Sequence, residues 1–315
     1  MYDDTISWNQ QLKIYPLEAC SISSLEFDPF EELLWIGSSS GRIQSYLTGI
    51  DFFENQEEVD IDPMRYSSFT VSESPIINIW PLDRTILQVS QTKCSMHTKG
   101  GMLMSNIATI DSYKELGTIL EADYPVSFTC SSIYRKMKST MTSYELEAQF
   151  SWQLPTHLFV GTNTKRAFCY DLNNISSRSK PSTPMQYYDT IVGSTCVKEN
   201  GSFVFFGGND GKVRLFDGRL NGERVQHVID AHNGSLVDMS VHINGMIVAT
   251  CGLQTRSINP YDPNSPVKYG SDPYVKLLDL RMMKSSASLA LSAKAIPQSL
   301  RFFYFYFYFH IIFRF

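Results

Sequence analysis

Residues 205–216 read FFGGNDGKVRLF, and their pattern decides the fold because two other segments of this 315-residue chain repeat it. The repeats are WIGSSSGRIQSY at 35–46 and FVGTNTKRAFCY at 159–170. In each, an apolar strand ends at a glycine, a small polar turn follows, and a second strand alternates up to an aromatic residue nine positions after that glycine. A repeated hairpin of this kind predicts the central strands of the blades of an all-β propeller.

Further copies of the unit extend the repeat along the chain, and we expect them at 21–49, 75–90, 126–170, 193–231 and 235–284. A Lys/Met/Ser/Thr-rich stretch at 134–143 interrupts the third unit, and an insertion at 253–270 opens the turn of the fifth. A sixth unit begins at 297–302 and stops after one strand. The prediction is an N-terminal segment, 1–20, and then an incomplete WD40-type β-propeller over 21–302, with about five blades plus the first strand of a sixth.

The chain ends in a low-complexity run of Phe and Tyr, 303–315, which has no turn residue and no glycine. Phe and Tyr codons differ by a single base, so a T-rich stretch of DNA encodes such a run. We interpret the run as an artefact of the gene model, from read-through or a frame error at an exon edge. The alternative is a genuine, aggregation-prone aromatic tail. Uninterrupted in-frame transcript sequence across this point would overturn the artefact.

Composition narrows the class of protein. The formal net charge is −5, which supplies no general basic field for nucleic acid. Six cysteines show no C-x-x-C pair, and two of them, Cys169 and Cys251, lie inside apolar strand runs, which favours a reduced, intracellular protein. The first 20 residues lack the pattern of a signal peptide, and the run 302–315 is too short to span a membrane.

The sequence offers no catalytic, cofactor-binding or metal-binding set. The six histidines have no metal-ligand spacing with cysteine or aspartate, and neither a G-x-S-x-G nor an H-E-x-x-H motif is present. The glycine-rich segment 207–211 is followed by a strand and not by a helix, so it predicts a hairpin turn and not a phosphate loop.

Five polar residues are expected to brace the blades. His232 lies just ahead of an inner strand, where its imidazole can hydrogen bond to the hydroxyl of Thr250. Asp210 and Asp279 are interpreted as turn and strand-end residues that satisfy backbone donors, and Asp272 occupies the place of Asp210 in the fifth unit.

Two insertions are candidate interaction surfaces, because loops held by rigid blades carry the functions of propellers. The first is basic, with Arg135, Lys136 and Lys138, and is either a solvated loop or a contact for an acidic partner or RNA phosphate. The second, 255–263, mixes Arg, Tyr and apolar residues and is either a contact surface or a self-packed loop. Its candidate contact residues are Thr255, Arg256 and Tyr261.

Three stretches around the fifth unit indicate a family. They are DAH at 230–232, VATCGLQTR at 248–256 and DPYVKLLDLRMM at 272–283, and the first unit (25–41) and Leu300-Arg301-Phe302 agree with them. Together they resemble the N-terminal WD40 propeller of the catalytic subunit of the poly(A)-binding-protein-dependent poly(A)-specific ribonuclease. The resemblance covers roughly 20–302 and is strongest at its two ends.

The resemblance implies a non-catalytic platform of seven blades. In that family a linker engages a pseudokinase-like partner subunit, a ubiquitin-hydrolase-like domain follows, and a C-terminal exonuclease domain uses divalent metal, Mg²⁺, to shorten poly(A) tails in the cytoplasm. This chain carries none of that machinery, so no enzyme activity of its own is expected, and poly(A)-binding-protein-coated mRNA would be reached only indirectly. The implied location is cytoplasmic, including processing bodies, and no membrane is implied. The alternatives are a WD-repeat scaffold of an unrelated intracellular complex and a propeller that binds RNA directly.

Overall fold

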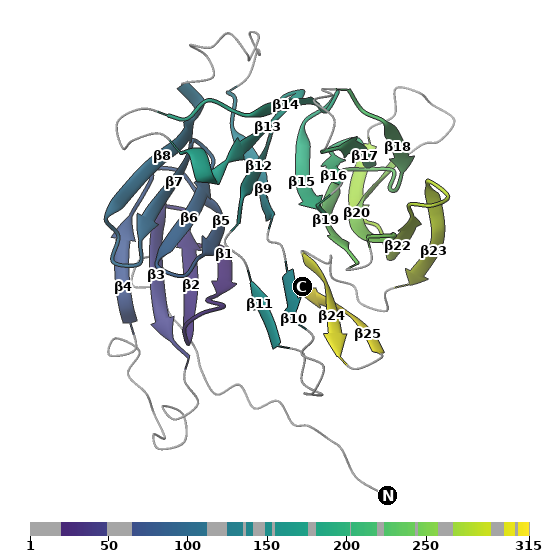
Figure 1. Ribbon diagram of the computed structural model, residues 1–315. Helices are drawn as coiled ribbons and strands as arrows, with labels where there is room; N and C mark the ends of the chain where they lie inside the picture. The colour runs from purple at the N-terminus through teal and green to yellow at the C-terminus, as the bar shows by residue number, and fades with distance from the viewer. Residues whose placement is uncertain are drawn as a thin grey trace, which may run out of the picture. The chain divides into compact units, whose positions relative to one another are not determined.

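The computed structural model contains several small antiparallel sheets, with strands labelled in Figure 1. The structure describes residues 20–48, 65–111, 125–134, 137–140, 149–152, 155–175, 181–201, 203–218, 224–242, 245–257, 267–290, 299–305 and 308–314. The chain divides into two compact units, one within residues 1–90 and 96–104 and one within residues 91–95 and 105–315.

The first two sheets each have four strands that follow one another in sequence order. Blade 1 consists of β1 (Ile22–Phe27), β2 (Leu33–Ser38), β3 (Arg42–Leu47) and β4 (Arg65–Thr70). Blade 2 consists of β5 (Ile76–Pro81), β6 (Thr85–Ser90), β7 (Lys93–Thr98) and β8 (Leu103–Thr109). This is the meander of a propeller blade, in which short turns bring sequential strands side by side.

Three further sheets have the same order, with insertions in two of them. Blade 3 consists of β9 (Phe128–Tyr134), β12 (His157–Thr162), β13 (Arg166–Asp171) and β14 (Gln186–Asp189), with a short 3-10 helix, η3 (Leu172–Asn174), after β13. Blade 4 consists of β15 (Ser194–Glu199), β16 (Phe203–Gly208), β17 (Lys212–Asp217) and β18 (His227–Asp230). Blade 5 consists of β19 (Leu236–Val241), β20 (Ile247–Ser257), β22 (Tyr274–Asp279) and β23 (Lys284–Ala290).

The insertions predicted in the third and fifth units are two-stranded ribbons. Between β9 and β12, β10 (Met137–Thr140) pairs with β11 (Gln149–Trp152). In blade 5, the second half of β20 continues past the blade and pairs with β21 (Val267–Ser271). The chain ends in another pair, β24 (Ser299–Phe305) and β25 (Tyr308–Arg314). The predicted first strand of a sixth blade corresponds to β24, and the aromatic run adds a second strand that the sequence does not predict.

Apolar side chains join neighbouring blades within the second unit. The cluster between blades 4 and 5 includes Phe205 and Leu215 from one blade and Met239 and Leu278 from the other, each no more than 1% exposed. Burial of such side chains stabilises the fold by about 1.5–3 kcal/mol each. The strands β9, β15 and β19, which open their blades, pack against one another in series.

One backbone contact repeats in four blades and explains the turn pattern of the sequence. The carbonyl at the end of the central turn accepts a hydrogen bond from an amide just after the outer strand of the same blade. The carbonyl groups are those of Gly41, Thr92, Lys165 and Gly211, and the donors are Val71, Ile110, Thr190 and Ala231, at 3.0, 3.0, 2.9 and 3.2 Å. Because this contact is local to each blade, the sequence repeat specifies it directly.

A buried charge cluster closes the first turn of blade 1, at Asp28. The Asp28 carboxylate accepts hydrogen bonds from the amides of Phe30 (2.9 Å) and Glu31 (3.2 Å) and from Nε1 of Trp35 (3.0 Å). The Lys99 ammonium lies 2.8 Å from both Asp28 and Glu31. Burial lowers the pKa of Lys99, but the two carboxylates outweigh burial and raise it.

Candidate interaction site

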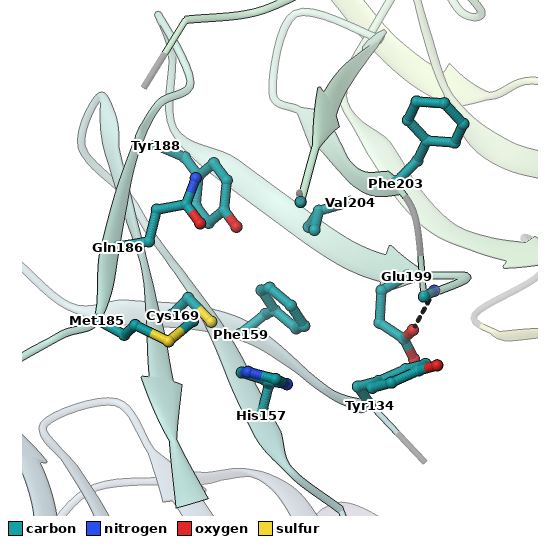
Figure 2. Close-up of a pocket in the computed structure, with 12 residues that line it drawn as sticks. Tyr134, His157, Phe159, Cys169, Met185, Gln186, Tyr188, Glu199, Phe203 and Val204 are labelled. Atoms are coloured by element: carbon teal, nitrogen blue, oxygen red, sulfur yellow. Dashed lines mark hydrogen bonds between the residues drawn. The ribbon is translucent and has the colours of Figure 1, made fainter. Parts of the chain in front are cut away.

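A pocket opens between blades 3 and 4, and we call it the blade 3–4 pocket (Figure 2). Its volume is about 90 Å³, well below the roughly 300–1,000 Å³ typical of small-molecule sites. Six of its lining residues carry the chemistry of the site: Tyr134, His157, Phe159, Tyr188, Glu199 and Phe203. A space of this size accommodates the end of one side chain.

The strand order brings these side chains together. Tyr134 ends β9, and Glu199 ends β15, the neighbouring strand of blade 4. His157 and Phe159 lie in β12, and Tyr188 lies in β14. The pocket therefore lies where β9 and β15 end and the chain turns back toward β12 and β16.

Aromatic rings form one wall of the pocket in a continuous series. The centroids of Tyr134 and His157 are 6.4 Å apart, as are those of His157 and Phe159 and those of Phe159 and Tyr188. Phe159 and Tyr188 belong to the buried core between blades 3 and 4. The wall is therefore held by the core, and only its Tyr134 and His157 end is partly exposed.

Glu199 supplies the negative charge of the pocket. Its Oε2 accepts a hydrogen bond of 3.1 Å from the amide of Gly201, at the turn into β16 (Figure 2). Burial raises the pKa of Glu199 to about 7, although the Gly201 hydrogen bond and the charge of Lys198 act in the other direction. Among the described residues, no cationic group lies within ion-pair distance of this carboxylate. Its charge is therefore poorly compensated.

Gly201 also fixes the Tyr134 end of the pocket. Its φ is +85°, and a Cβ added there would lie 2.7 Å from the Tyr134 hydroxyl. The Asn-Gly pair at 200–201, a dipeptide typical of tight turns, thus lets Tyr134 and the Glu199 carboxylate approach the same backbone.

The predicted hydrogen bond between His232 and Thr250 is present, with Nε2 and Oγ1 3.1 Å apart. The other ring nitrogen, Nδ1, lies 2.8 Å from Oδ2 of Asp272. All three residues are buried. In blade 4, Asp210 instead forms a bidentate pair with Arg214, at 2.9 and 2.6 Å.

The aspartates of the turns accept backbone hydrogen bonds. Asp210 accepts from the amide of Lys212 (3.3 Å), Asp272 from that of Tyr274 (3.1 Å), and Asp279 from that of Arg281 (2.9 Å). Two hydrogen bonds from Arg281 lower the pKa of Asp279 to about 2. Each of these three backbone contacts joins residues two positions apart, as expected for aspartates that stabilise turns.

The candidate surface residues lie only partly within the described structure. Arg135, Lys136 and Tyr261 lie outside the described residues. Lys138 lies in β10, so its backbone is paired with Ser151 and does not form the loop expected there. Arg256 lies in β20, paired with Lys268.

Thr255 donates a hydrogen bond of 2.7 Å to the carbonyl of Asn233. This contact ties the base of the β20–β21 ribbon to blade 5. The structure does not bring the two candidate surfaces together within the described residues.

The cysteines show no sign of reactivity. All six are free, and five are buried, including Cys169 and Cys251 as the sequence predicts. Burial raises the pKa of Cys130, Cys169 and Cys251 to about 12, so their thiolates are disfavoured. Across the described parts of the chain, no three His, Cys, Asp or Glu side chains come together as metal ligands. Within the same residues, no helix has the length and apolar character needed to cross a membrane.

Sequential four-stranded meanders, repeated turn contacts and the His232 cluster define a domain of the WD40 β-propeller class. Residues 150–313, just over half of the chain, match the PAN2 N-terminal family. The chain belongs to this family. The fold class and the family resemblance predicted from the sequence are both confirmed.

Curated relatives carry the name PAN2-PAN3 deadenylation complex catalytic subunit PAN2. The protein of Gallus gallus is 28% identical over 269 residues, covering 85% of this chain and 17% of that protein. The human protein is 28% identical over 282 residues (89% and 18%), and that of Candida albicans is 26% identical over 288 residues (89% and 21%). The chain thus spans about a fifth of the length of these relatives.

Solved structures support the fold. The WD40 domain of Neurospora crassa Pan2 matches with a TM-score of 0.57 and 16% identity, over 90% of this chain and 69% of that one. The WD40 β-propeller domain of Doa1 matches with a TM-score of 0.54 and 12% identity, over 89% and 71%. At these identities the likeness concerns the fold alone.

Proposed function

We propose that this chain is a protein-interaction platform within a PAN2-type deadenylation complex and does not cleave RNA by itself. The observation that carries the proposal is its membership of the PAN2 N-terminal family. Relatives named as catalytic subunits extend far beyond the part that this chain matches. A rigid propeller that presents loops and pockets from its blades suits the binding of other proteins.

The partners follow from the same family. The names of the relatives pair PAN2 with PAN3, and we propose that the complex of this chain contains the corresponding pseudokinase-like subunit. Poly(A)-binding-protein-coated mRNA would be the indirect target, and the cytoplasm the place of action.

The nuclease of the family implies divalent metal. The described residues of this chain do not fit such a site, because no three potential ligands come together among them. The proposal therefore places metal-dependent cleavage in the remainder of a full-length protein.

The test of the catalytic statement uses the purified chain with poly(A) RNA and Mg²⁺. We expect no shortening of the RNA beyond that of a buffer control, whereas robust shortening would overturn the proposal. The platform role is tested by co-purification of other proteins with a full-length PAN2-type protein that contains residues 20–302. Loss of one or more of these partners after deletion of residues 20–302 supports a platform, and an unchanged set of partners contradicts it.

Direct RNA binding is the second candidate, and it rests on the three cations at positions 135, 136 and 138. It predicts poly(A) affinity that falls steeply with salt. Replacing Arg135, Lys136 and Lys138 with alanine should then abolish that affinity. An affinity for poly(A) that does not change with salt or in this variant would exclude direct RNA binding through these cations.

A further inference from the structure

We propose that the blade 3–4 pocket is a docking site for a single arginine side chain of a partner protein. This inference deepens the proposed function and rests on it, because it gives the platform a defined site and its partner a defined chemistry. Three observations carry the inference: a carboxylate without an ion-pair partner among the described residues, an aromatic wall and a volume that fits one side chain.

The carboxylate of Glu199 sets the charge of the occupant. The one hydrogen bond to this carboxylate comes from the neutral amide of Gly201, and among the described residues it has no ion-pair partner. Burial raises its pKa to about 7, so the ionised form is disfavoured without a cation beside it. A cation placed in the pocket would restore the ionised form and form a charge-assisted hydrogen bond. An anionic ligand such as RNA phosphate would be repelled.

The aromatic wall selects arginine over lysine. Tyr134 and His157 lie at the open end of the ring series, with Phe159 and Tyr188 behind them (Figure 2). A guanidinium group is planar, stacks on aromatic faces and still offers donors at its edge to a carboxylate. An ammonium group is more strongly hydrated and cannot stack in this way. The pocket therefore matches a guanidinium that stacks on the rings and donates to Glu199.

The size and the exposure of the blade 3–4 pocket fit one side chain that enters from a partner protein. The volume of about 90 Å³ excludes a bulky ligand, and Met185, which also lines the pocket, is 54% exposed. Arginine is among the residues that carry the most binding energy at protein interfaces. An arginine that projects from a partner loop is therefore the occupant that the pocket fits.

The test measures binding of the peptide Ac-Gly-Arg-Gly-NH₂ to the purified chain, by following the Gly201 amide signal in ¹⁵N-labelled protein. The comparison peptides contain lysine or the neutral isostere citrulline in place of arginine. We expect a saturable shift with the arginine peptide, at least fivefold weaker binding of the lysine peptide and no saturation with the citrulline peptide. Equal binding of all three peptides, or no saturable shift with any of them, would overturn the inference.

Two variants assign the binding to the carboxylate. Glu199→Gln should weaken binding of the arginine peptide at least tenfold. Glu73→Gln, the same change at an exposed glutamate in the connection between β4 and β5, should leave binding unchanged. Binding to the wild type should also strengthen between pH 6 and pH 8, because Glu199 must be ionised. The other titratable or charged groups around it are Tyr134, His157, Cys169, Tyr188 and Lys198.

A pH dependence that persists in Glu199→Gln would come from those other groups and would overturn the role of Glu199. The platform function is tested separately by co-purification of the complex. If co-purification succeeds and the peptide does not bind, the arginine site is wrong and the platform stands. If both fail, the proposed function is wrong as well.

Discussion

The Nδ1 atom of His232 lies 2.8 Å from Oδ2 of Asp272, although 40 residues separate them in the chain. The β20–β21 ribbon is inserted between Thr250 and Asp272, yet the imidazole contacts both residues. Because burial favours the neutral imidazole, Nδ1–H donates to Asp272 and Nε2 accepts from the Thr250 hydroxyl. The cluster thus holds the two parts of blade 5 together where the ribbon leaves it.

Replacing Asp272 with alanine should destabilise the chain by about 2–3 kcal/mol, because the buried Nδ1–H of His232 and the amide of Tyr274 lose their acceptor. The free energy of unfolding is measured by urea denaturation of the purified chain. Asp230→Ala is the matched control. Asp230 lies on the surface in an exposed pair with Lys212, so its loss should cost about 0–1 kcal/mol. Equal losses for the two variants would show that the cluster does not brace blade 5.

His232 should make the stability depend on pH. Burial lowers its pKa, while Asp272 raises it by a smaller amount. The unfolded state therefore binds more protons below the ordinary histidine pKa of about 6.5. The contribution of His232 to stability is full above pH 6.5 and is lost as the pH falls through the lowered pKa of His232 in the folded state. We expect unfolding free energies measured between pH 7.5 and pH 5 to fall more steeply for the wild type than for His232→Gln. Parallel profiles would exclude this assignment.

Glu199 should make the stability fall as the pH rises, which is opposite to the effect of His232. Its pKa is about 7 in the folded protein against a usual 4.5, so the folded state holds the proton more tightly. The stability that this proton contributes is present below pH 4.5 and is lost as the pH rises through 7. The stability of Glu199→Gln relative to the wild type should therefore increase between pH 5 and pH 8, by about 2–3 kcal/mol. A difference that does not change with pH would mean that the carboxylate is fully hydrated.

The blades could be predicted because their signals are local. The units expected at 21–49 and 235–284 begin with β1 and β19, since alternation and turn residues lie within one short stretch. The ribbon strands at 137–140 and 149–152 were not predicted. Each of these strands has only four residues, and it pairs with a partner several residues away.

The candidate site was less predictable, because it is assembled from separate blades. The contact of His232 with Thr250 follows from the position of His232 just before an inner strand. The contact of His232 with Asp272 could not be predicted, because the β20–β21 ribbon is inserted between Thr250 and Asp272 in the sequence. The blade 3–4 pocket takes residues from six strands and matches no motif. Its one signal in the sequence is Glu199, a carboxylate that ends an inner strand just before the Asn-Gly turn.

The turn glycine of blade 4 gives the sharpest test of the repeat. Gly211 has a φ of +80°, and a Cβ there would overlap the backbone carbonyl oxygen of His232. Because backbone atoms cannot move aside cheaply, Gly211→Ala should destabilise the chain by at least about 2 kcal/mol. Gly270→Ala is the control, since among the described residues no atom beyond its chain neighbours lies within 4 Å of the position of its Cβ, and it should change stability by less than about 0.5 kcal/mol. Urea denaturation of both variants measures the difference, and a tolerated alanine at 211 would contradict the turn geometry on which the blade repeat depends.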